Sequence, residues 1–145
     1  MRPWRKLTWA FKKFIASLIF MSQHNEVGKI GEDLARKYLE KEGYKIIDQN
    51  YKTKYAEIDL IAQKPSKFLG KSMLVFVEVR TKVGEQWGSP EDTINKAKLW
   101  KVLQNAKSYA AFNKWQGSER IDAICIVLKN DFSVSRLTHH ENIIS

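Results

Sequence analysis

Residues 74–82 read Leu-Val-Phe-Val-Glu-Val-Arg-Thr-Lys, and residues 56–62 read Ala-Glu-Ile-Asp-Leu-Ile-Ala. Each stretch has the β-branched and aliphatic composition of a β-strand, with carboxylates set among apolar side chains. The apolar run from Met73 to Val79 is typical of a strand that is buried on both faces of a sheet. Burying a charge in such a strand is costly, so the acids in these two stretches point to a function.

Side chains alternate along a strand, and this alternation groups the charged residues. Glu78, Arg80 and Lys82 share one face of the second stretch. Glu57 and Asp59 share one face of the first. If the strands are neighbours, Asp59 and Glu78 meet and can hold a divalent cation, because ions such as Mg²⁺ take oxygen ligands and often only one or two protein carboxylates. The spacing leaves a second interpretation open, in which Glu78 and Arg80 form a structural ion pair at the sheet margin.

Periodicity and turn residues predict the remaining elements. Apolar residues recur at helical spacing over residues 26–42, and Gly43 ends that helix. Ser89-Pro90 followed by two acids is typical of a helix start, and this helix is expected to run to about Asn113. Further strands are expected over residues 44–48, 120–128 and 133–137. The order helix, three strands, helix, one or two strands predicts an α/β fold with a mixed central sheet flanked by helices.

The composition indicates one folded domain with an affinity for polyanions. The chain has 145 residues, of which 43% are hydrophobic, and its formal net charge is +9. The length predicts a single core, and the charge favours nucleic acid or an anionic membrane surface as a partner. The single cysteine, Cys125, excludes an internal disulfide and fits a reducing compartment, so a cytoplasmic protein is expected.

Residues 1–22 are expected to form a basic amphipathic extension that precedes a folded domain of residues 23–145. Residues 1–20 contain five Lys or Arg and no acid. The apolar run from Phe14 to Met21 is shorter than the about 20 residues that a membrane span needs. No small-x-small cleavage site follows it, which disfavours a signal peptide. The extension either lies on a membrane surface or precedes a true start at Met21, and the sequence leaves both open.

Several motifs occur together in a recognisable order. They are Gly31-Glu32, Glu57-Ile58-Asp59-Leu60-Ile61, Phe76-Val77-Glu78-Val79-Arg80, Gly88-Ser89-Pro90, Lys96 and Arg120-Ile121-Asp122. In this order they resemble the YraN family of predicted endonucleases, over roughly residues 27–143. That family is related distantly to archaeal Holliday-junction resolvases and to restriction-endonuclease-like nucleases with an Asp, then Glu-x-Lys, signature. The resemblance implies a restriction-endonuclease-like fold and hydrolysis of DNA phosphodiester bonds with Mg²⁺ or Mn²⁺, and leaves open whether the DNA is branched.

The resemblance also implies roles for single residues. Asp59 and Glu78 are expected as metal ligands, with the Val79 carbonyl as a third. Arg80 stands where lysine is usual, and Ala56 stands where glycine is usual. Arginine cannot accept a proton, but it can orient water or clamp a phosphate oxygen. A nucleic-acid-binding protein that keeps the nuclease fold without turnover is therefore the alternative function.

Two further groups are expected near such a site. Glu32 lies beside small residues of the first helix, so it either approaches the sheet as another metal ligand or remains a solvated acid. DNA binding is expected from basic side chains. These are Arg80, Lys82, Lys96, Lys98 and Lys101. The competing interpretation is that the helix lysines only keep the helix soluble. A homodimer is a further expectation, because resolvase-like nucleases often cut two strands.

Overall fold

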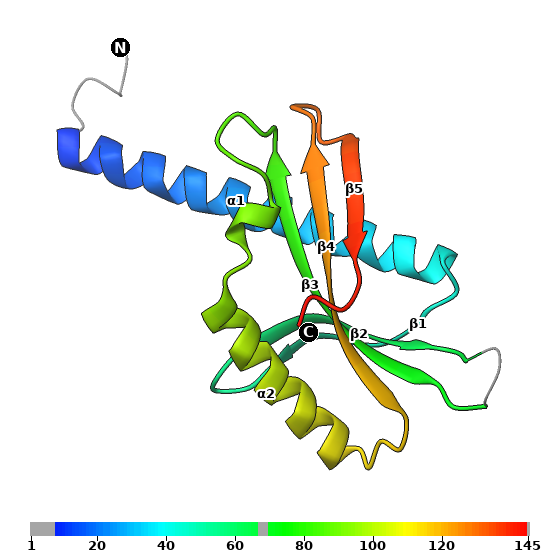
Figure 1. The fold of residues 1–145 in the computed structure, drawn as a ribbon. Helices are drawn as coiled ribbons and strands as arrows, with labels where there is room; N and C mark the ends of the chain where they lie inside the picture. Colours follow the sequence, from blue (N-terminus) through cyan, green and yellow to red (C-terminus); the bar gives the residue numbers. More distant parts are fainter. Residues whose placement is uncertain (1–7, 67–69, 145) are drawn as a thin grey trace.

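A five-stranded mixed sheet lies between two helices (Figure 1). The computed structural model describes residues 8–66 and 70–144. In chain order the elements are α1 (Trp9–Lys41), β1 (Lys45–Lys52), β2 (Glu57–Lys64), β3 (Met73–Val83), the 3₁₀ helix η2 (Glu91–Thr93), α2 (Lys96–Phe112), β4 (Ser118–Leu128) and β5 (Val134–His140). The predicted α/β class is confirmed, and the arrangement is consistent with a restriction-endonuclease-like fold.

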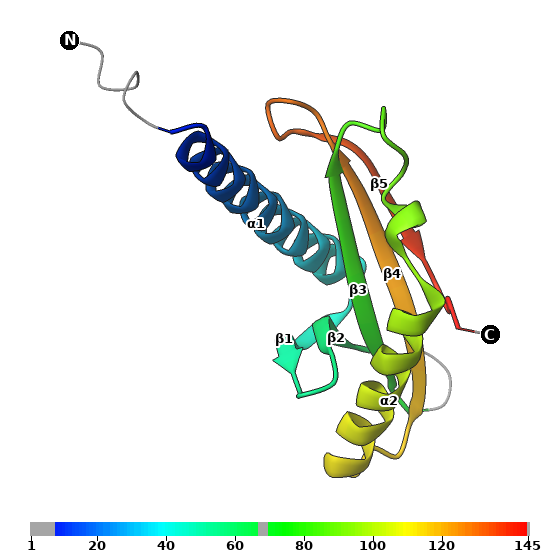
Figure 2. The ribbon, with the colours of Figure 1, turned by 90° about the vertical axis from the view of Figure 1, so that its left-hand side faces the viewer.

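The sheet has the strand order β1-β2-β3-β4-β5. Among the described strands, β3 and β4 pair in parallel and the other neighbouring pairs are antiparallel. The chain between these parallel strands includes α2, and Figure 2 shows α1 and α2 on opposite sides of the sheet. The β2–β3 ladder ends at Leu60 opposite Val77, whereas the β3–β4 ladder continues to Val83 opposite Leu128. The part of β3 from Glu78 to Val83, more than half of the strand, therefore lacks β2 as a ladder partner.

Two apolar clusters hold the helices on the sheet. The α1 side contains Leu39 with Leu60, Val77 and Ile124, and the α2 side contains Phe76 with Val102, Tyr109 and Ile121. Fully burying one such aliphatic or aromatic side chain contributes roughly 1.5–3 kcal/mol. An exposed ion pair contributes about 0–1 kcal/mol. The clusters, rather than the surface ion pairs of α1, therefore account for the layering.

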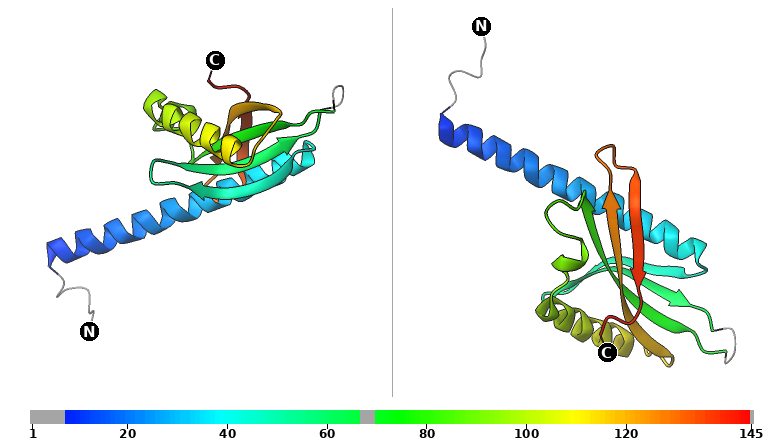
Figure 3. Two further views of the ribbon diagram at one scale, coloured as in Figure 1. Left: turned by 90° about the horizontal axis from the view of Figure 1, so that it is seen from below. Right: turned by 45° about the horizontal axis from the view of Figure 1, so that its top comes forward.

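Helix α1 begins earlier than the predicted helix at residue 26. It starts at Trp9, where the Thr8 hydroxyl accepts a hydrogen bond from the Phe11 N–H, and it continues unbroken to Lys41. Extending an existing helix is favourable even without packing, whereas starting a new one is costly. Figure 3 shows the first half of α1 projecting past the sheet. Gly43, with φ +86°, follows the helix end as predicted.

The structure describes the expected N-terminal extension, residues 1–22, only in part. Residues 1–7 of the expected extension lie outside the described residues. The expected boundary after residue 22 falls within α1, and contact of residues 1–20 with a membrane surface stays a prediction. Within residues 8–66 and 70–144, no helix combines the length and the apolarity needed to cross a membrane.

The second long helix begins later than predicted. The Ser89-Pro90 motif starts only the short η2, after which Ile94 is extended at φ −82° and ψ 111°. Asn95 then caps α2, and its side-chain oxygen accepts a hydrogen bond of 2.7 Å from the Lys98 N–H. Asn is among the preferred N-cap residues, because its side chain satisfies a free N–H of the first turn. The predicted start at Pro90 was wrong, and the correction places Lys98 in the first turn of α2.

Helix α1 packs tightly against β3 at Gly31. A Cβ atom at Gly31 would lie 1.8 Å from Thr81 Oγ1 and 2.8 Å from Thr81 Cβ. We expect Gly31→Ala to lower the free energy of unfolding by about 1–3 kcal/mol, the usual cost of overpacking, as measured by urea denaturation. Gly28→Ala is the matched control, because a Cβ there meets nothing within 4 Å. It should be neutral or stabilising by about 1 kcal/mol, and equal losses in both variants would contradict the contact.

Candidate metal centre

The site lies where β2 separates from β3. Asp59 and Glu78 are the first residues beyond the last ladder pair, Leu60 and Val77. Ile58 packs in the α2-side cluster and Leu60 in the α1-side cluster, although residues two apart in a regular strand share a face. The alternation therefore breaks at Asp59.

The Asp59 carboxylate binds the neighbouring strand through the backbone. Asp59 Oδ2 accepts a hydrogen bond of 2.7 Å from the Val79 N–H. This bond gives the Val79 amide a partner beyond the end of the β2–β3 ladder. Among the described residues, none donates a hydrogen bond to the other oxygen, Oδ1. One oxygen therefore fixes the carboxylate on β3, and the second is left to accept a ligand.

Glu78 is buried, with 2% of its surface exposed. Its Oε1 lies 2.8 Å from Arg80 Nη2 on the same strand and 2.5 Å from Lys98 Nζ on α2. Its Oε2 is buried and has no hydrogen-bond partner in the part of the chain that the structure describes. A buried polar atom without a hydrogen-bond partner destabilises the fold by about 1–3 kcal/mol, and by more if the group is charged. Such an oxygen fits a metal ligand better than a purely structural ion pair.

The two acids are electrostatically coupled. Burial, and then the negative charge of Glu78, raise the pKa of Asp59 from its ordinary 3.8 to about 7. The negative charge of Glu32 also raises this pKa, while the Val79 N–H and Lys98 lower it. Like charges held close together favour binding of a proton or a cation between them. The arrangement can therefore exchange a proton for a divalent metal ion.

The raised pKa of Asp59 predicts how the stability of the metal-free protein depends on pH. Between about pH 4 and pH 7 the folded protein holds a proton on Asp59 that the unfolded chain has lost. The free energy of unfolding should therefore fall as the pH rises through this window, by at most about 4 kcal/mol for three pKa units. Urea denaturation in EDTA at several pH values measures this slope. Asp59→Asn should flatten it, and an unchanged slope in the variant would assign the effect to other groups.

Glu32 approaches the centre from α1. It is half-buried, and Asn50 Nδ2 donates a hydrogen bond of 3.1 Å to its Oε2. Burial and then the negative charge of Glu57 raise the pKa of Glu32, and Glu78 raises it further. The small residue that lets α1 approach is Gly31 rather than Gly28. The structure thus brings Glu32 near the coupled pair, and metal ligation by Glu32 stays a prediction.

The other predicted residues lie at different distances from this centre. Lys82 Nζ donates hydrogen bonds to the carbonyls of Trp87 and Gly88, at 3.4 and 3.2 Å, so it ties β3 to the following loop. Lys96 and Lys101 are exposed on α2. Lys98 instead reaches Glu78, which its position in the sequence did not indicate. Metal binding by the Val79 carbonyl and DNA binding by these lysines stay predictions.

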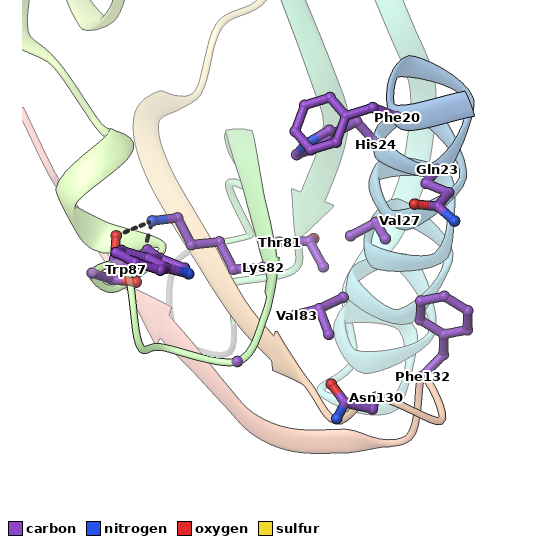
Figure 4. A pocket seen from close by; sticks show the side chains of 12 residues that line it. Phe20, Gln23, His24, Val27, Thr81, Lys82, Val83, Trp87, Asn130 and Phe132 are labelled. Atoms are coloured by element: carbon purple, nitrogen blue, oxygen red, sulfur yellow. Dashed lines mark hydrogen bonds between the residues drawn. The ribbon is translucent and has the colours of Figure 1, made fainter. Parts of the chain in front are cut away.

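A hollow beside the end of β3 does not contain the acids. It has a volume of about 490 Å³ and lies between the end of β3 and α1 (Figure 4). In Figure 4, Lys82 and Trp87 lie on one side of β3, and Phe20, Val27 and Phe132 lie on the other. This lining contains no carboxylate. The chemistry of the buried acids, rather than cavity size, therefore identifies the candidate centre.

A second group of potential ligands does not fit a cation. Ligand atoms of Glu91, Cys125 and His140 lie within 4.8 Å of one another. Arg136 already binds both oxygens of Glu91, at 2.7 and 3.1 Å. Burial, followed by the negative charge of Glu91, raises the pKa of the Cys125 thiol to about 12. Both features oppose metal binding, because thiol ligands must lose their proton and a neighbouring guanidinium repels cations.

Comparison with known proteins finds relatives over most of the chain. The model of the uncharacterised protein family UPF0102 matches residues 31–126. A UPF0102 protein of Flavobacterium johnsoniae is 37% identical over 123 residues, which cover 81% of this chain and 95% of that protein. UPF0102 proteins of Sulfurihydrogenibium sp. and Caldanaerobacter subterraneus subsp. tengcongensis are 38% and 36% identical, over 74% and 78% of this chain and 94% and 89% of theirs. The family match includes Glu32, Asp59, Glu78 and Lys98.

Proposed function

This chain belongs to the uncharacterised protein family UPF0102, and we propose that it is a metal-dependent endonuclease that binds DNA and hydrolyses its phosphodiester bonds. The observation that carries the proposal is the buried Oε2 of Glu78 beside Asp59, an oxygen that has no hydrogen-bond partner among the described residues. Two cationic side chains hold the other oxygen of Glu78. Acids that can bind a metal thus lie beside cations that can bind phosphate.

Asp59 and Glu78 would hold the metal ion, through Asp59 Oδ1 and Glu78 Oε2. Both atoms are carboxylate oxygens without a described hydrogen-bond donor, and carboxylates are the side-chain ligands that Mg²⁺ and Mn²⁺ prefer. Glu32 would add a ligand from α1, directly or through water. When bound, such an ion makes water a stronger acid and neutralises charge on the scissile phosphate.

Arg80 would contribute charge without accepting a proton. Its Nη2 is held by Glu78, and its Nε is buried without a hydrogen-bond partner among the described residues. A guanidinium is a poor proton acceptor, and it can bind two phosphate oxygens at once. We therefore assign Arg80 to phosphate binding and to the orientation of Glu78, and the attacking water would lose its proton to solvent.

The DNA backbone would approach along the start of α2. Lys96 and Lys101 are exposed there, and the net charge of +9 favours a polyanion. The N-terminus of a helix also attracts phosphate, because its free N–H groups and its dipole are positive. Contacts of this kind are independent of base sequence and weaken as the salt concentration rises.

A DNA-binding protein without turnover is the second candidate. Arg80 is the residue that favours it, since the related nuclease signature has lysine at this position. In that case the acids and the basic side chains would bind a metal and DNA without cleavage.

Cleavage of defined DNA substrates tests the proposal. We would incubate the full chain with fluorescent single-stranded, duplex and four-way-junction DNA in Mg²⁺, Mn²⁺ or EDTA, beside Asp59→Asn. We expect cutting that needs metal and is lost in the variant, and the preferred substrate would show whether branched DNA is recognised. Binding without cutting in either metal would favour the second candidate.

A further inference from the structure

Glu78 is bound both by an arginine of its own strand, β3, and by a lysine of α2. Lys98 Nζ lies 2.5 Å from Glu78 Oε1, 20 residues along the chain from the acid that it binds. Arg80, two residues after Glu78 on β3, shares the same oxygen at 2.8 Å. We infer that Lys98 is the catalytic lysine of this site, and that it donates a hydrogen bond to a non-bridging oxygen of the scissile phosphate. The inference rests on the proposed nuclease function and deepens it.

The position of Lys98 in its helix opposes helix stability. It lies in the first turn of α2, and that turn contains no acid. A positive charge at a helix N-terminus is typically unfavourable by about 0.3–1 kcal/mol, because it faces the positive end of the helix dipole. Lys96 lies in the same turn. A negatively charged group bound at this end of α2 would offset the repulsion between the two lysines and the helix dipole. Glu78 supplies only one carboxylate for the two lysines, so a bound phosphate could supply the remaining negative charge.

The side chain of Lys98 is more exposed than that of Arg80. The side chain of Lys98 is 40% exposed and that of Arg80 is 26% exposed. An ammonium has three donors. Within the described residues Lys98 Nζ uses one of them, toward Glu78. Its remaining donors can therefore reach a phosphate while Glu78 keeps the side chain in place.

The proposed step is hydrolysis of one phosphodiester bond by water. The oxygen of a water molecule bonds to phosphorus and gives its proton to bulk water. The bond from phosphorus to the leaving sugar oxygen breaks, and that oxygen takes a proton from bulk water. Lys98 takes no part in these proton transfers, and its hydrogen bond strengthens as charge builds on the phosphate oxygen. Removing one such donor usually slows catalysis by about 10²–10³-fold.

Lys98→Met tests the inference, with Lys107→Met as the matched control. Lys107 lies nine residues further along α2 and is exposed. Single-turnover cleavage of the preferred DNA should fall by at least about 100-fold in Lys98→Met and by less than about threefold in Lys107→Met. Calorimetric titration with Mn²⁺ in the absence of DNA provides a second readout. Lys98→Met should bind Mn²⁺ as tightly as the natural chain or more tightly, because a positive charge beside Glu78 is removed.

Chemical rescue separates a catalytic ammonium from a folding defect. Lys98→Cys treated with 2-bromoethylamine regains an amine at nearly the original length. Cys125 is fully buried, so the introduced thiol is the accessible one. We expect cleavage to be lost in Lys98→Cys and restored in large part after treatment.

The outcomes distinguish this inference from the proposed function. If Lys98→Met cuts DNA within about threefold of the natural chain while Glu78→Gln does not, the inference alone is overturned. Parallel losses of Mn²⁺ affinity and cleavage would also overturn it, because Lys98 would then only position Glu78. If the natural chain binds Mn²⁺ but cuts no DNA, the proposed function fails and the inference fails with it.

Discussion

Glu78→Gln should reduce metal-dependent DNA cleavage by at least about 10³-fold while it changes DNA affinity by less than about threefold. The amide keeps the volume of the side chain, but it replaces one acceptor oxygen with an NH₂ donor and removes the charge. The buried Oε2, which we assign to the metal, would no longer bind a cation. Arg80 and Lys98 would remain beside the amide and could still bind phosphate.

Single-turnover cleavage at saturating metal measures the first effect, and fluorescence anisotropy in Ca²⁺ or EDTA measures the second. Glu57→Gln is the matched control. Glu57 is an acid of β2 whose partner, Lys52 Nζ, lies 3.3 Å away at a partly exposed position. That variant should keep nearly full activity. Undiminished cleavage in Glu78→Gln would remove Glu78 from the metal centre and with it the proposed geometry.

Asp122→Ala is expected to have the largest effect on stability, a loss of about 3–5 kcal/mol. Asp122 is fully buried on β4, and Arg120 binds both of its oxygens at 2.8 Å. His139 Nε2 and the Asn142 N–H contact the same carboxylate at 2.8 and 2.9 Å. Without Asp122, the Arg120 side chain, which is only 13% exposed, would lose its closest negative partner. The pairing of Asp122 with Arg120 also agrees with a structural role for this acid.

Urea denaturation measures the loss, and Asp33→Ala is the matched control. Asp33 also pairs with an arginine, Arg36, at 2.6 Å, but on the exposed surface of α1. Its removal should cost less than about 1 kcal/mol, because solvent screens exposed pairs. Similar losses in the two variants would show that burial does not decide the strength of the Asp122 network.

The Asp122 network also predicts acid sensitivity. Burial alone would raise the pKa of Asp122, but hydrogen bonds from His139, Arg120 and the Asn142 N–H together lower it below 3.8. The unfolded chain then takes up a proton at a higher pH than the folded protein does. The stabilisation is therefore present above about pH 4 and is lost as the pH falls through the folded-state pKa. Asp122→Ala should lack this part of the acid transition.

Local patterns were sufficient to predict most of the fold. The apolar residues of β3 and of β2, and the helical spacing of apolar residues over residues 26–42, each reflect side chains that must face a core. Gly43 ended α1 as expected, because a positive φ is readily available to glycine. The start of α2 was misjudged, since Pro90 and the acids after it are equally compatible with a single 3₁₀ turn.

Of the candidate site, only the two acids could be predicted from the sequence. A carboxylate in an otherwise apolar strand is visible in sequence because burying it is costly, so Asp59 and Glu78 could be selected. Lys98 could not be assigned to Glu78 from spacing, because 20 residues and a loop separate them. The sequence also could not show that Gly31 packs against Thr81. Helix α1 contains two glycines, Gly28 and Gly31, and only the structure shows which of them contacts β3.

The sequence by itself determined the strands, the two acids and the positive charge, since hydrophobic periodicity and the cost of buried charge act within a few residues. The tertiary structure alone decided that β2 separates from β3 at Asp59 and that α2 brings Lys98 to Glu78 Oε1. It also decided that no described residue donates a hydrogen bond to Glu78 Oε2. These features depend on contacts between segments far apart in the chain. Both helices pack on one sheet, and this packing sets the relative positions of side chains that lie far apart in the sequence.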